Sequence, residues 1–168
     1  MASWQIEFLK QKGLKPDNKI LDIGCGVLRA GIPLIKYLEP VNYYGMDISR
    51  RALLKGHERV HENNLETKRP VIIRNDDLEL EEVRNQKFDF LLAQSVLTHL
   101  PPEQVKTLFQ NVGRVMDEDS EFYATIYKKT ENIGEGPKEL KSAGREMIDW
   151  EYSIEWLQEQ AEKKDLVV

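Results

Sequence analysis

The chain has 168 residues, of which 40% are hydrophobic and 32% charged, and its formal charge is −5. These values predict one globular domain over residues 1–168, long enough to bury a core. No apolar run approaches the roughly 20 residues needed to cross a bilayer, and the first residues do not resemble a secretion signal. We therefore expect a cytoplasmic protein without a membrane partner.

Charge and cysteine content narrow the class of protein further. Neither Lys nor Arg gathers into a long block, so the electrostatic footprint of a general nucleic-acid binder is missing. The single cysteine, Cys25, excludes an internal disulfide and leaves no cluster with the spacing of metal ligands. We expect no metal site and no nucleic-acid partner.

The first elements along the chain are a short helix, a strand and a glycine turn. Apolar residues at helical spacing predict a helix over residues 3–12. Residues 19–23 form a nearly continuous apolar run, typical of a central parallel strand that is covered on both faces. Asp22 interrupts the run near its end, and Gly24 and Gly26 follow. Two residues without Cβ atoms let the backbone turn sharply and let a ligand approach main-chain N–H groups.

The glycine turn does not fit the pattern that binds dinucleotides. That pattern, G-x-G-x-x-G, has a third glycine where this chain has Arg29, and the next glycine is Gly31. An oxidoreductase that binds a nicotinamide cofactor is therefore a distant alternative. After the turn, apolar residues recur with helical period from Leu28 to Leu38 and predict the next helix.

A second strand, residues 41–46, ends in an acidic side chain. Asp47 lies a little over twenty residues beyond Gly24, where a carboxylate can accept both hydroxyls of a ribose. Standing alone, it would more often be a turn or helix-capping carboxylate, and its spacing from Gly24 favours the ribose. Ser49 is placed to cap a helix over residues 49–64.

A third short strand, residues 70–74, leads into two adjacent acids. Asp77 followed by Leu78 suits the edge of an adenine site, because the carboxylate accepts from the exocyclic amine while the apolar side chain covers the ring. Two adjacent acids could equally form a solvated turn, and we favour Asp77 over Asp76.

The remaining elements continue the alternation of strands and helices. Residues 88–93 and 122–127 predict two strands, and a helix begins at Pro101 and Pro102 between them. This alternation predicts an α/β fold with a doubly wound, mostly parallel, Rossmann-like sheet and helices on both faces.

The C-terminal part is less regular. Residues 128–150 show no clear period and predict a long connection, which deserves testing as a lid. A last helix is expected over residues 153–164, and residues 165–168 look like the start of a sixth strand.

Four motifs in this order and spacing resemble those of class I S-adenosylmethionine-dependent methyltransferases over nearly the whole chain. They lie at residues 21–26, 44–48, 76–78 and 88–95. The resemblance implies S-adenosylmethionine as the cofactor. The main chain of Gly24, Cys25 and Gly26 would border its methionine part, and Asp22 would reach the ammonium group through water.

The same resemblance assigns the nucleoside. Asp47 would hold the ribose, the adenine would lie between Ile48 and Leu78, and Asp77 would bind the adenine amine. Each of these residues follows the carboxyl end of the second or third predicted strand.

The transferring methyl would lie near the end of the fourth strand, beside Ala93 and Gln94. His99 is the only histidine that the motifs place there, and it would act as the base if the acceptor is a hydroxyl or an acidic carbon. It could instead be a helix-start histidine packed beside Leu97 and Leu100.

Two departures from the family pattern stand out. The commoner loop has a third glycine two residues after Gly26, where this chain has Leu28. Arg29 is then a candidate for the cofactor carboxylate, with an internal salt bridge as the alternative. The family sheet usually ends in a hairpin of sixth and seventh strands, and the C-terminal strand or strands are missing here. The chain is then truncated, or an oligomer or partner domain covers the exposed sheet edge, or catalysis has been lost.

The resemblance implies methyl transfer by in-line displacement, the EC 2.1.1 class, with a small-molecule acceptor favoured by the acidic surface and the compact domain. The alternative is a catalytically inactive binding or interaction module with the methyltransferase fold. The set of Asp22, Gly24, Gly26 and Asp47 opposes the alternative, because a purely structural domain does not need it.

Overall fold

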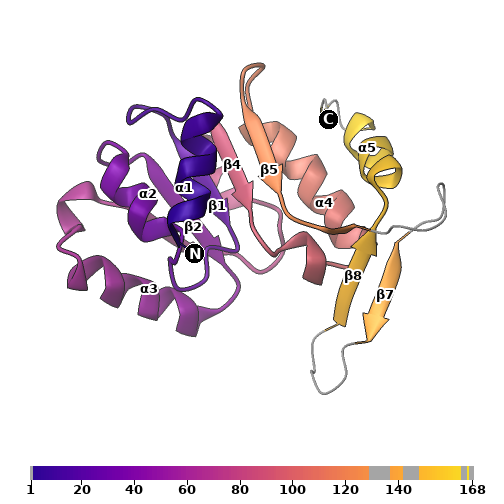
Figure 1. Cartoon of the computed structure of the whole chain (residues 1–168), viewed down its shortest axis with the longest axis horizontal. Helices are drawn as coiled ribbons and strands as arrows, with labels where there is room; N and C mark the ends of the chain where they lie inside the picture. The colour runs from indigo at the N-terminus through magenta and orange to yellow at the C-terminus, as the bar shows by residue number, and fades with distance from the viewer. Residues whose placement is uncertain (1, 129–136, 142–147, 164–165, 167–168) are drawn as a thin grey trace.

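The computed structural model of the chain describes residues 2–128, 137–141, 148–163 and 166. Its centre is a five-stranded sheet in the order β3-β2-β1-β4-β5, with every neighbouring pair parallel (Figure 1). The strand order reverses between β1 and β4, as in a doubly wound fold. The strands are β1 (Ile20–Ile23), β2 (Tyr43–Asp47), β3 (Val71–Arg74), β4 (Phe90–Ala93) and β5 (Glu121–Ala124).

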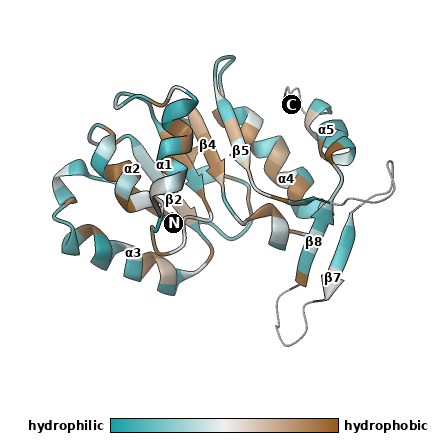
Figure 2. Ribbon diagram, in the orientation of Figure 1, coloured by the Kyte–Doolittle hydropathy of each residue, from teal (hydrophilic) through white to brown (hydrophobic). Residues whose placement is uncertain are grey.

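Helices cover both faces of this sheet. On one face, Ile20 and Leu92 pack with the first three helices, and on the other, Leu21 and Leu91 pack with the last two. Alternate residues of the central strands thus face opposite cores, which explains their continuous apolar run, visible as brown strands in Figure 2. The predicted fold is confirmed. The helices are α1 (Ala2–Gln11), α2 (Gly31–Tyr37), α3 (Arg50–Glu62), α4 (Pro102–Val112) and α5 (Ile154–Glu162).

The helix starts follow local chemistry. Ser49 caps α3 as predicted, with its side chain accepting a hydrogen bond from Ala52 N at 3.2 Å. The prediction that a helix begins at Leu28 is wrong, because Leu28 has φ +59° and α2 begins only at Gly31. Leu28 still belongs to the apolar core beside α2. It fits the helical spacing of apolar residues because it is buried with them, and not because it is part of the helix.

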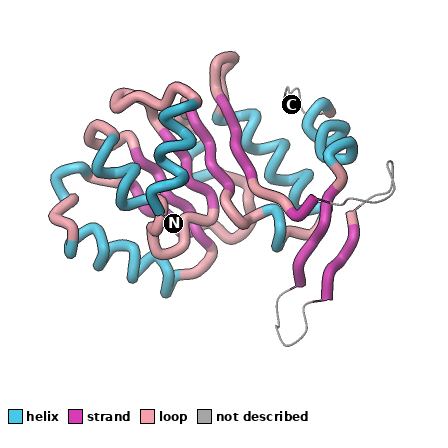
Figure 3. The backbone as a smooth tube through the Cα atoms, in the orientation of Figure 1, coloured by secondary structure: helices cyan, strands magenta, loops and turns pink. Residues whose placement is uncertain are grey.

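A second, smaller sheet follows the first. Its order is β6-β8-β7, from β6 (Tyr127–Lys128), β7 (Lys138–Lys141) and β8 (Ile148–Tyr152). β6 pairs parallel and β7 antiparallel with β8, and Figure 3 shows β7 and β8 projecting from the body of the molecule. The predicted fifth strand therefore splits, with β5 ending at Ala124.

The predicted connection over residues 128–150 is wrong where the structure describes it, since residues 138–141 and 148–150 are strand. The pattern was missed because these strands are short and carry many charged residues. The lid interpretation falls on residues 129–136 and 142–147, which lie outside the described residues. Apart from Leu166, the expected sixth strand lies outside them too.

Among the described helices, none is long and apolar enough to cross a membrane.

Within the described part of the chain, β5 ends the larger sheet and pairs only with β4. The carboxyl ends of the parallel strands all lie at one edge, where the arrowheads of β4 and β5 point in Figure 1. That edge positions the candidate site.

Candidate active site

The loop after β1 carries the two glycines of the first motif. Gly24 has φ +69° and Gly26 has φ +55°, a left-handed region that residues with side chains rarely adopt. A Cβ atom at Gly24 would also lie 2.4 Å from Val96 Cγ2, whereas one at Gly26 would meet nothing within 4 Å. Gly24 is required by both conformation and packing, and the backbone at Gly26 borders open space that a ligand can approach.

Asp47, at the end of β2, holds this loop. Its Oδ2 accepts a hydrogen bond from Gly26 N at 2.8 Å, and its Oδ1 accepts one from Ser49 N at 2.7 Å. A carboxylate has about four lone-pair sites, so each oxygen keeps capacity for one more donor. The sequence left two roles open for Asp47, a carboxylate that holds a turn and an acceptor for ribose hydroxyls. One side chain has enough lone pairs to fill both roles.

Asp22 lies beneath the loop and is almost fully buried. Its Oδ2 accepts a hydrogen bond from Tyr43 OH at 2.7 Å. Burial raises the pKa of the Asp22 carboxyl to about 7; the hydrogen bond from Tyr43 opposes this shift, and the nearby Asp47 carboxylate adds to it. A cation near this carboxyl would favour its ionised form.

Two further hydrogen bonds brace the loop. Cys25 N donates to Met46 O at 2.9 Å, and Arg59 Nη1 in α3 donates to Val27 O at 2.9 Å. Burial also raises the pKa of the Cys25 thiol, which keeps it protonated and inert. Cys25 therefore contributes its main chain to the loop and its side chain to the core.

Leu28 occupies the position of the family's third glycine and keeps a glycine-like backbone, with φ +59°. Its side chain is fully buried against α3. A Cβ atom at Gly56 would lie 3.0 Å from Leu28 Cγ, so the missing side chain at Gly56 makes room for Leu28. The departure from the family pattern is accommodated inside the protein, and the turn is preserved.

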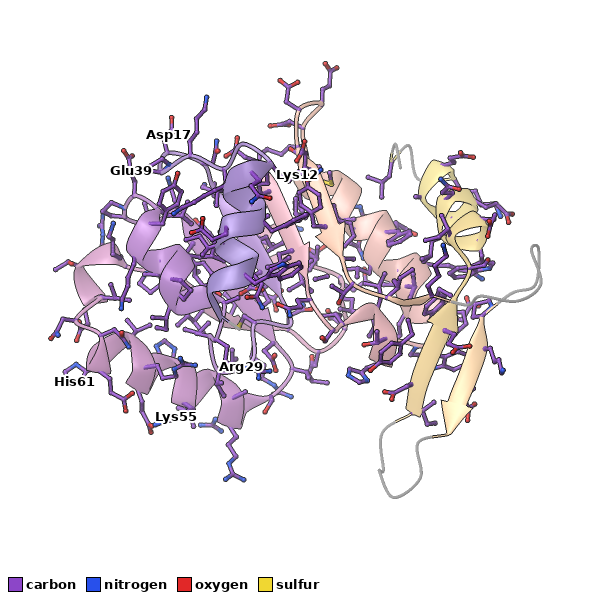
Figure 4. The ribbon with its side chains drawn as sticks, viewed as in Figure 1. Lys12, Asp17, Arg29, Glu39, Lys55 and His61 are labelled. Carbon is purple, nitrogen blue, oxygen red and sulfur yellow. The ribbon has the colours of Figure 1, made fainter. Side chains whose placement is uncertain are left out.

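Arg29, the candidate for the cofactor carboxylate, is exposed. Among the described residues it has no ion-pair partner, so the internal salt bridge left open by the sequence is not formed there. Figure 4 draws Arg29 on the lower side of the molecule with Lys55, opposite Asp17 and Glu39. This is the side to which the carboxyl ends of the strands point.

The turn after β3 lies against the end of β2. Asn75 N donates to Asp47 O at 3.2 Å, and Asn75 Oδ1 accepts from Leu78 N at 3.1 Å. Ile48, the next residue after Asp47, leaves 63% of its surface exposed, unusual for a large apolar side chain. Ile48 and Leu78 thus lie on two turns that these hydrogen bonds connect.

The two acids of this turn differ in their partners. Asp76 Oδ2 pairs with Arg74 Nη2 at 2.7 Å. Asp77 Oδ1 accepts from Glu79 N at 2.9 Å and from Asn75 Nδ2 at 3.0 Å, which leaves its second oxygen for another donor. Asp77 therefore has an oxygen that could accept a hydrogen bond from the adenine amine, whereas Asp76 is paired with Arg74.

The end of β4 meets α1. Ala93 is fully buried, and its carbonyl accepts a hydrogen bond from Thr125 N at 3.2 Å, so it supports the site without exposing its side chain. Gln94 Oε1 accepts a hydrogen bond from Gln5 Nε2 in α1. Beside this pair lies a cavity of about 140 Å³. Its lining residues are Trp4, Gln5, Phe8, Leu92, Gln94, Tyr123, Ala124 and Thr125.

His99 closes the short 3-10 turn η3 (Leu97–His99). Its Nδ1 lies 2.8 Å from Oδ1 of Asp149, a buried residue of β8, and a third of the His99 side chain is exposed. Val96, immediately before this turn, packs against Gly24. The turn is thus adjacent to the glycine loop.

Three residues of this site were missed by the sequence reasoning. Arg59 and Gln5 act on a loop and a strand far from them in sequence, which no local pattern reports. Asp149 lies in the alternating stretch Ile148–Tyr152, where an acidic residue between apolar ones was a weak strand signal in a segment interpreted as a connection.

Comparisons with known proteins identify the family and the fold. The family model described as "Methyltransferase domain" matches residues 21–122. Magnesium protoporphyrin IX methyltransferase from Synechocystis PCC 6803, solved with bound SAM, aligns over 97% of this chain and 66% of its own length, with 18% identity and a TM-score of 0.71. With bound SAH, the alignment covers 55% of that enzyme. The chain thus spans between about half and two thirds of its length.

Two other solved structures are similar over more of their own length. A SAM-dependent methyltransferase from Methanosarcina mazei aligns over 93% of this chain and 82% of its own length, with 19% identity and a TM-score of 0.74. The glycopeptide N-methyltransferase MtfA, complexed with SAH, aligns over 97% of this chain and 78% of its own length, with 12% identity and a TM-score of 0.75. These likenesses show the fold. Since the family model spans more than half of the chain, the protein belongs to the class I S-adenosylmethionine-dependent methyltransferases.

Proposed function

We propose that the chain binds S-adenosylmethionine and transfers its methyl group to a small-molecule acceptor. The observation that carries this proposal is the Asp47 carboxylate, which holds the glycine loop through Gly26 N and keeps a free lone pair on each oxygen. A vicinal diol supplies two hydroxyl donors that match this capacity.

The other residues of the edge fit the same cofactor. The backbone at Gly26 and the carboxyl of Asp22 suit the amino-acid part, with Arg29 for its carboxylate. Ile48 and Leu78 suit the adenine ring, and the free oxygen of Asp77 suits its amine. When bound, the cofactor supplies an electrophilic methyl group on a sulfonium.

The acceptor side lies at the ends of β4 and β5. The cavity there has a volume of about 140 Å³. A cavity of about 150 Å³ holds one benzene-sized molecule, so this one suits a single ring-sized apolar group. Its walls are mainly apolar and aromatic, and the polar groups of Gln94 and Thr125 are at hand to orient a donor or acceptor atom. These features support a small molecule over an extended polymer.

His99 supports a reaction that needs a base. His99 does not line the cavity, but its turn packs against the glycine loop through Val96 and a third of its side chain is exposed. It can therefore take the proton of an acceptor hydroxyl that extends from the cavity toward the loop, while the rest of the chain holds the reactants in line. Gln94, at the end of β4, would border the transferring methyl.

The test is calorimetric titration with S-adenosylhomocysteine, run beside NAD, on the wild-type chain and on Asp47→Asn. An amide at position 47 must turn an N–H₂ group toward one of the two N–H donors, so we expect the affinity to fall about 10- to 100-fold. Asp17→Asn removes a carboxylate from the opposite side of the molecule and serves as the matched control.

The outcomes separate the alternatives. Binding of S-adenosylhomocysteine that weakens only in Asp47→Asn supports the cofactor site, and turnover is then sought with labelled S-adenosylmethionine and a panel of single-ring alcohols and amines. Binding without turnover would favour an inactive binding module. Failure to bind S-adenosylhomocysteine, or tighter binding of NAD, would overturn the proposal.

A further inference from the structure

The second sheet reaches into the candidate site through one strand. β8 packs against the turn η3, and Asp149 of β8 lies 2.8 Å from His99, from Oδ1 to Nδ1. Asp149 is 7% exposed, so this carboxylate points into the protein rather than into solvent. Nothing in the sequence motifs connects these two residues, which are fifty positions apart.

The contact determines which nitrogen of His99 is available. The two atoms are at ion-pair distance, although their arrangement does not meet the geometry of a hydrogen bond. Because a carboxylate can only accept, a proton on Nδ1 is the arrangement that makes this contact favourable. The Nδ1 atom is buried, so the exposed third of the side chain belongs to its other atoms. In the neutral ring, Nε2 then has the free lone pair that a base needs.

A second contact from β8 fixes the same turn. Tyr152 is fully buried, and its hydroxyl donates to Leu100 O at 2.6 Å, one residue beyond His99. Asp149 thus holds the ring and Tyr152 holds the backbone beside it. Holding both the ring and its backbone is what positioning a base requires, because small displacements lower the rate strongly.

We propose that Asp149 is a positioning residue for His99, which fixes the Nδ1–H tautomer and directs Nε2 toward the methyl acceptor; this rests on the proposed function. Nε2 takes the proton of the acceptor O–H as the acceptor oxygen forms its bond to the methyl carbon. The bond between that carbon and sulfur breaks, and its electron pair stays on sulfur. Asp149 stabilises the imidazolium, which then releases its proton to water.

The first measurement is ¹⁵N NMR of the His99 ring at a pH where an ordinary histidine is neutral. The wild-type ring should show Nδ1 protonated and Nε2 unprotonated. In Asp149→Asn the side-chain amide can donate to Nδ1, and the Nε2–H tautomer should become the main form. Glu151→Gln removes a neighbouring carboxylate on the same strand and should leave the tautomer unchanged. His99→Gln assigns the signal.

The second measurement is methyl transfer to the single-ring acceptor with the highest turnover in the panel. Asp149→Asn should lower kcat about 100-fold and leave KM for S-adenosylmethionine within about twofold, since general-base catalysis contributes on this scale. If Asp149 had only a structural role, Asp149→Asn would lower stability without lowering kcat selectively at constant KM. Denaturant unfolding followed by circular dichroism measures stability separately.

Two results would overturn the proposed role of Asp149. A wild-type Nε2–H tautomer, or an unchanged kcat in a folded Asp149→Asn, overturns the proposal. If that variant does not fold, the wild-type tautomer still decides, because its measurement needs no substitution at position 149. Failure of the proposed function appears separately, as absent binding of S-adenosylhomocysteine to the wild-type chain.

Discussion

The ionisation of Asp22 is coupled to folding. Its pKa is about 7 in the fold against an ordinary 3.8, because burial removes the carboxyl from water. Between these values the folded chain keeps a proton that the unfolded chain has released. Its contribution to the free energy of unfolding is fully present below pH 3.8 and lost as pH rises through about 7.

Asp22→Asn should therefore remove a slope of up to about 1.4 kcal/mol per pH unit in the free energy of unfolding. Urea denaturation between about pH 5 and pH 8 measures it, with Asp17→Asn as the exposed control. The free energy of unfolding of the wild type and the control should fall from about pH 5 to about pH 7 and change little above pH 7, whereas that of Asp22→Asn should lack this fall. Parallel pH profiles for all three proteins would contradict the assigned shift.

The same residue predicts a pH dependence of ligand binding. An ammonium group near Asp22 favours the carboxylate, so S-adenosylhomocysteine should bind more tightly as pH rises through about 7, with release of a proton. Calorimetry in two buffers of different ionisation enthalpy detects that proton. Asp22→Asn should abolish the release, and equal proton release in both proteins would exclude this role for Asp22.

At the scale of elements, the glycine loop and α3 meet through Leu28 and Gly56. Alanine normally stabilises a helix by about 1 kcal/mol relative to glycine. Here the new Cβ would lie 3.0 Å from Leu28 Cγ and 3.2 Å from its Cδ1, in a fully buried side chain with a left-handed backbone. Gly56→Ala should instead lower the free energy of unfolding by about 1–3 kcal/mol.

Denaturant unfolding tests this prediction, with Lys55→Ala as the control on the exposed face of the same helix. Because Leu28 belongs to the loop, Gly56→Ala should also weaken binding of S-adenosylhomocysteine. A stabilised Gly56→Ala variant would show that Leu28 can move aside and that its contact with α3 does not fix the loop.

The elements also show what a sequence can predict. Strong periods and local caps, such as that of Ser49, located the five described α-helices and the five strands of the larger sheet, but not the four short 3-10 helices. Leu28 was misplaced because burial produces the same period as a helix. β7 and β8 were missed because short strands at the surface carry little apolar signal. Asp149 was missed with them, because its contact is with His99, fifty residues away in the sequence.

The motifs explain why the rest of the candidate site could be predicted. Gly24, Gly26 and Asp47 follow directly on strands whose order sets their neighbours, so local spacing carries the three-dimensional information. Gln5 and Arg59 gave no signal, because each forms a hydrogen bond between elements whose packing is decided by the whole core.

At the scale of the whole molecule, Tyr152 links the two sheets. Tyr152→Phe keeps the ring that packs on Trp156 but removes the donor to Leu100 O. We expect a loss of about 1 kcal/mol in the free energy of unfolding. Tyr127→Phe, at an exposed position of β6, is the matched control and should be neutral.

The same experiment asks whether the sheets unfold together. Tryptophan fluorescence and far-ultraviolet circular dichroism should give coincident transitions in the wild type if folding is two-state. Separate transitions would mean that the second sheet folds independently and that its contacts with η3 add little to overall stability.

The loop that Asp47 holds through Gly26 has a consequence for binding kinetics. Its hydrogen bonds to Asp47, Met46 and Arg59 come from the chain itself, so no segment of the loop must be ordered by a ligand. Association then needs no ordering of this loop, and we expect stopped-flow traces to be single exponentials whose rate rises linearly with ligand concentration. Differences in affinity among cofactor analogues would accordingly lie in how fast each one leaves.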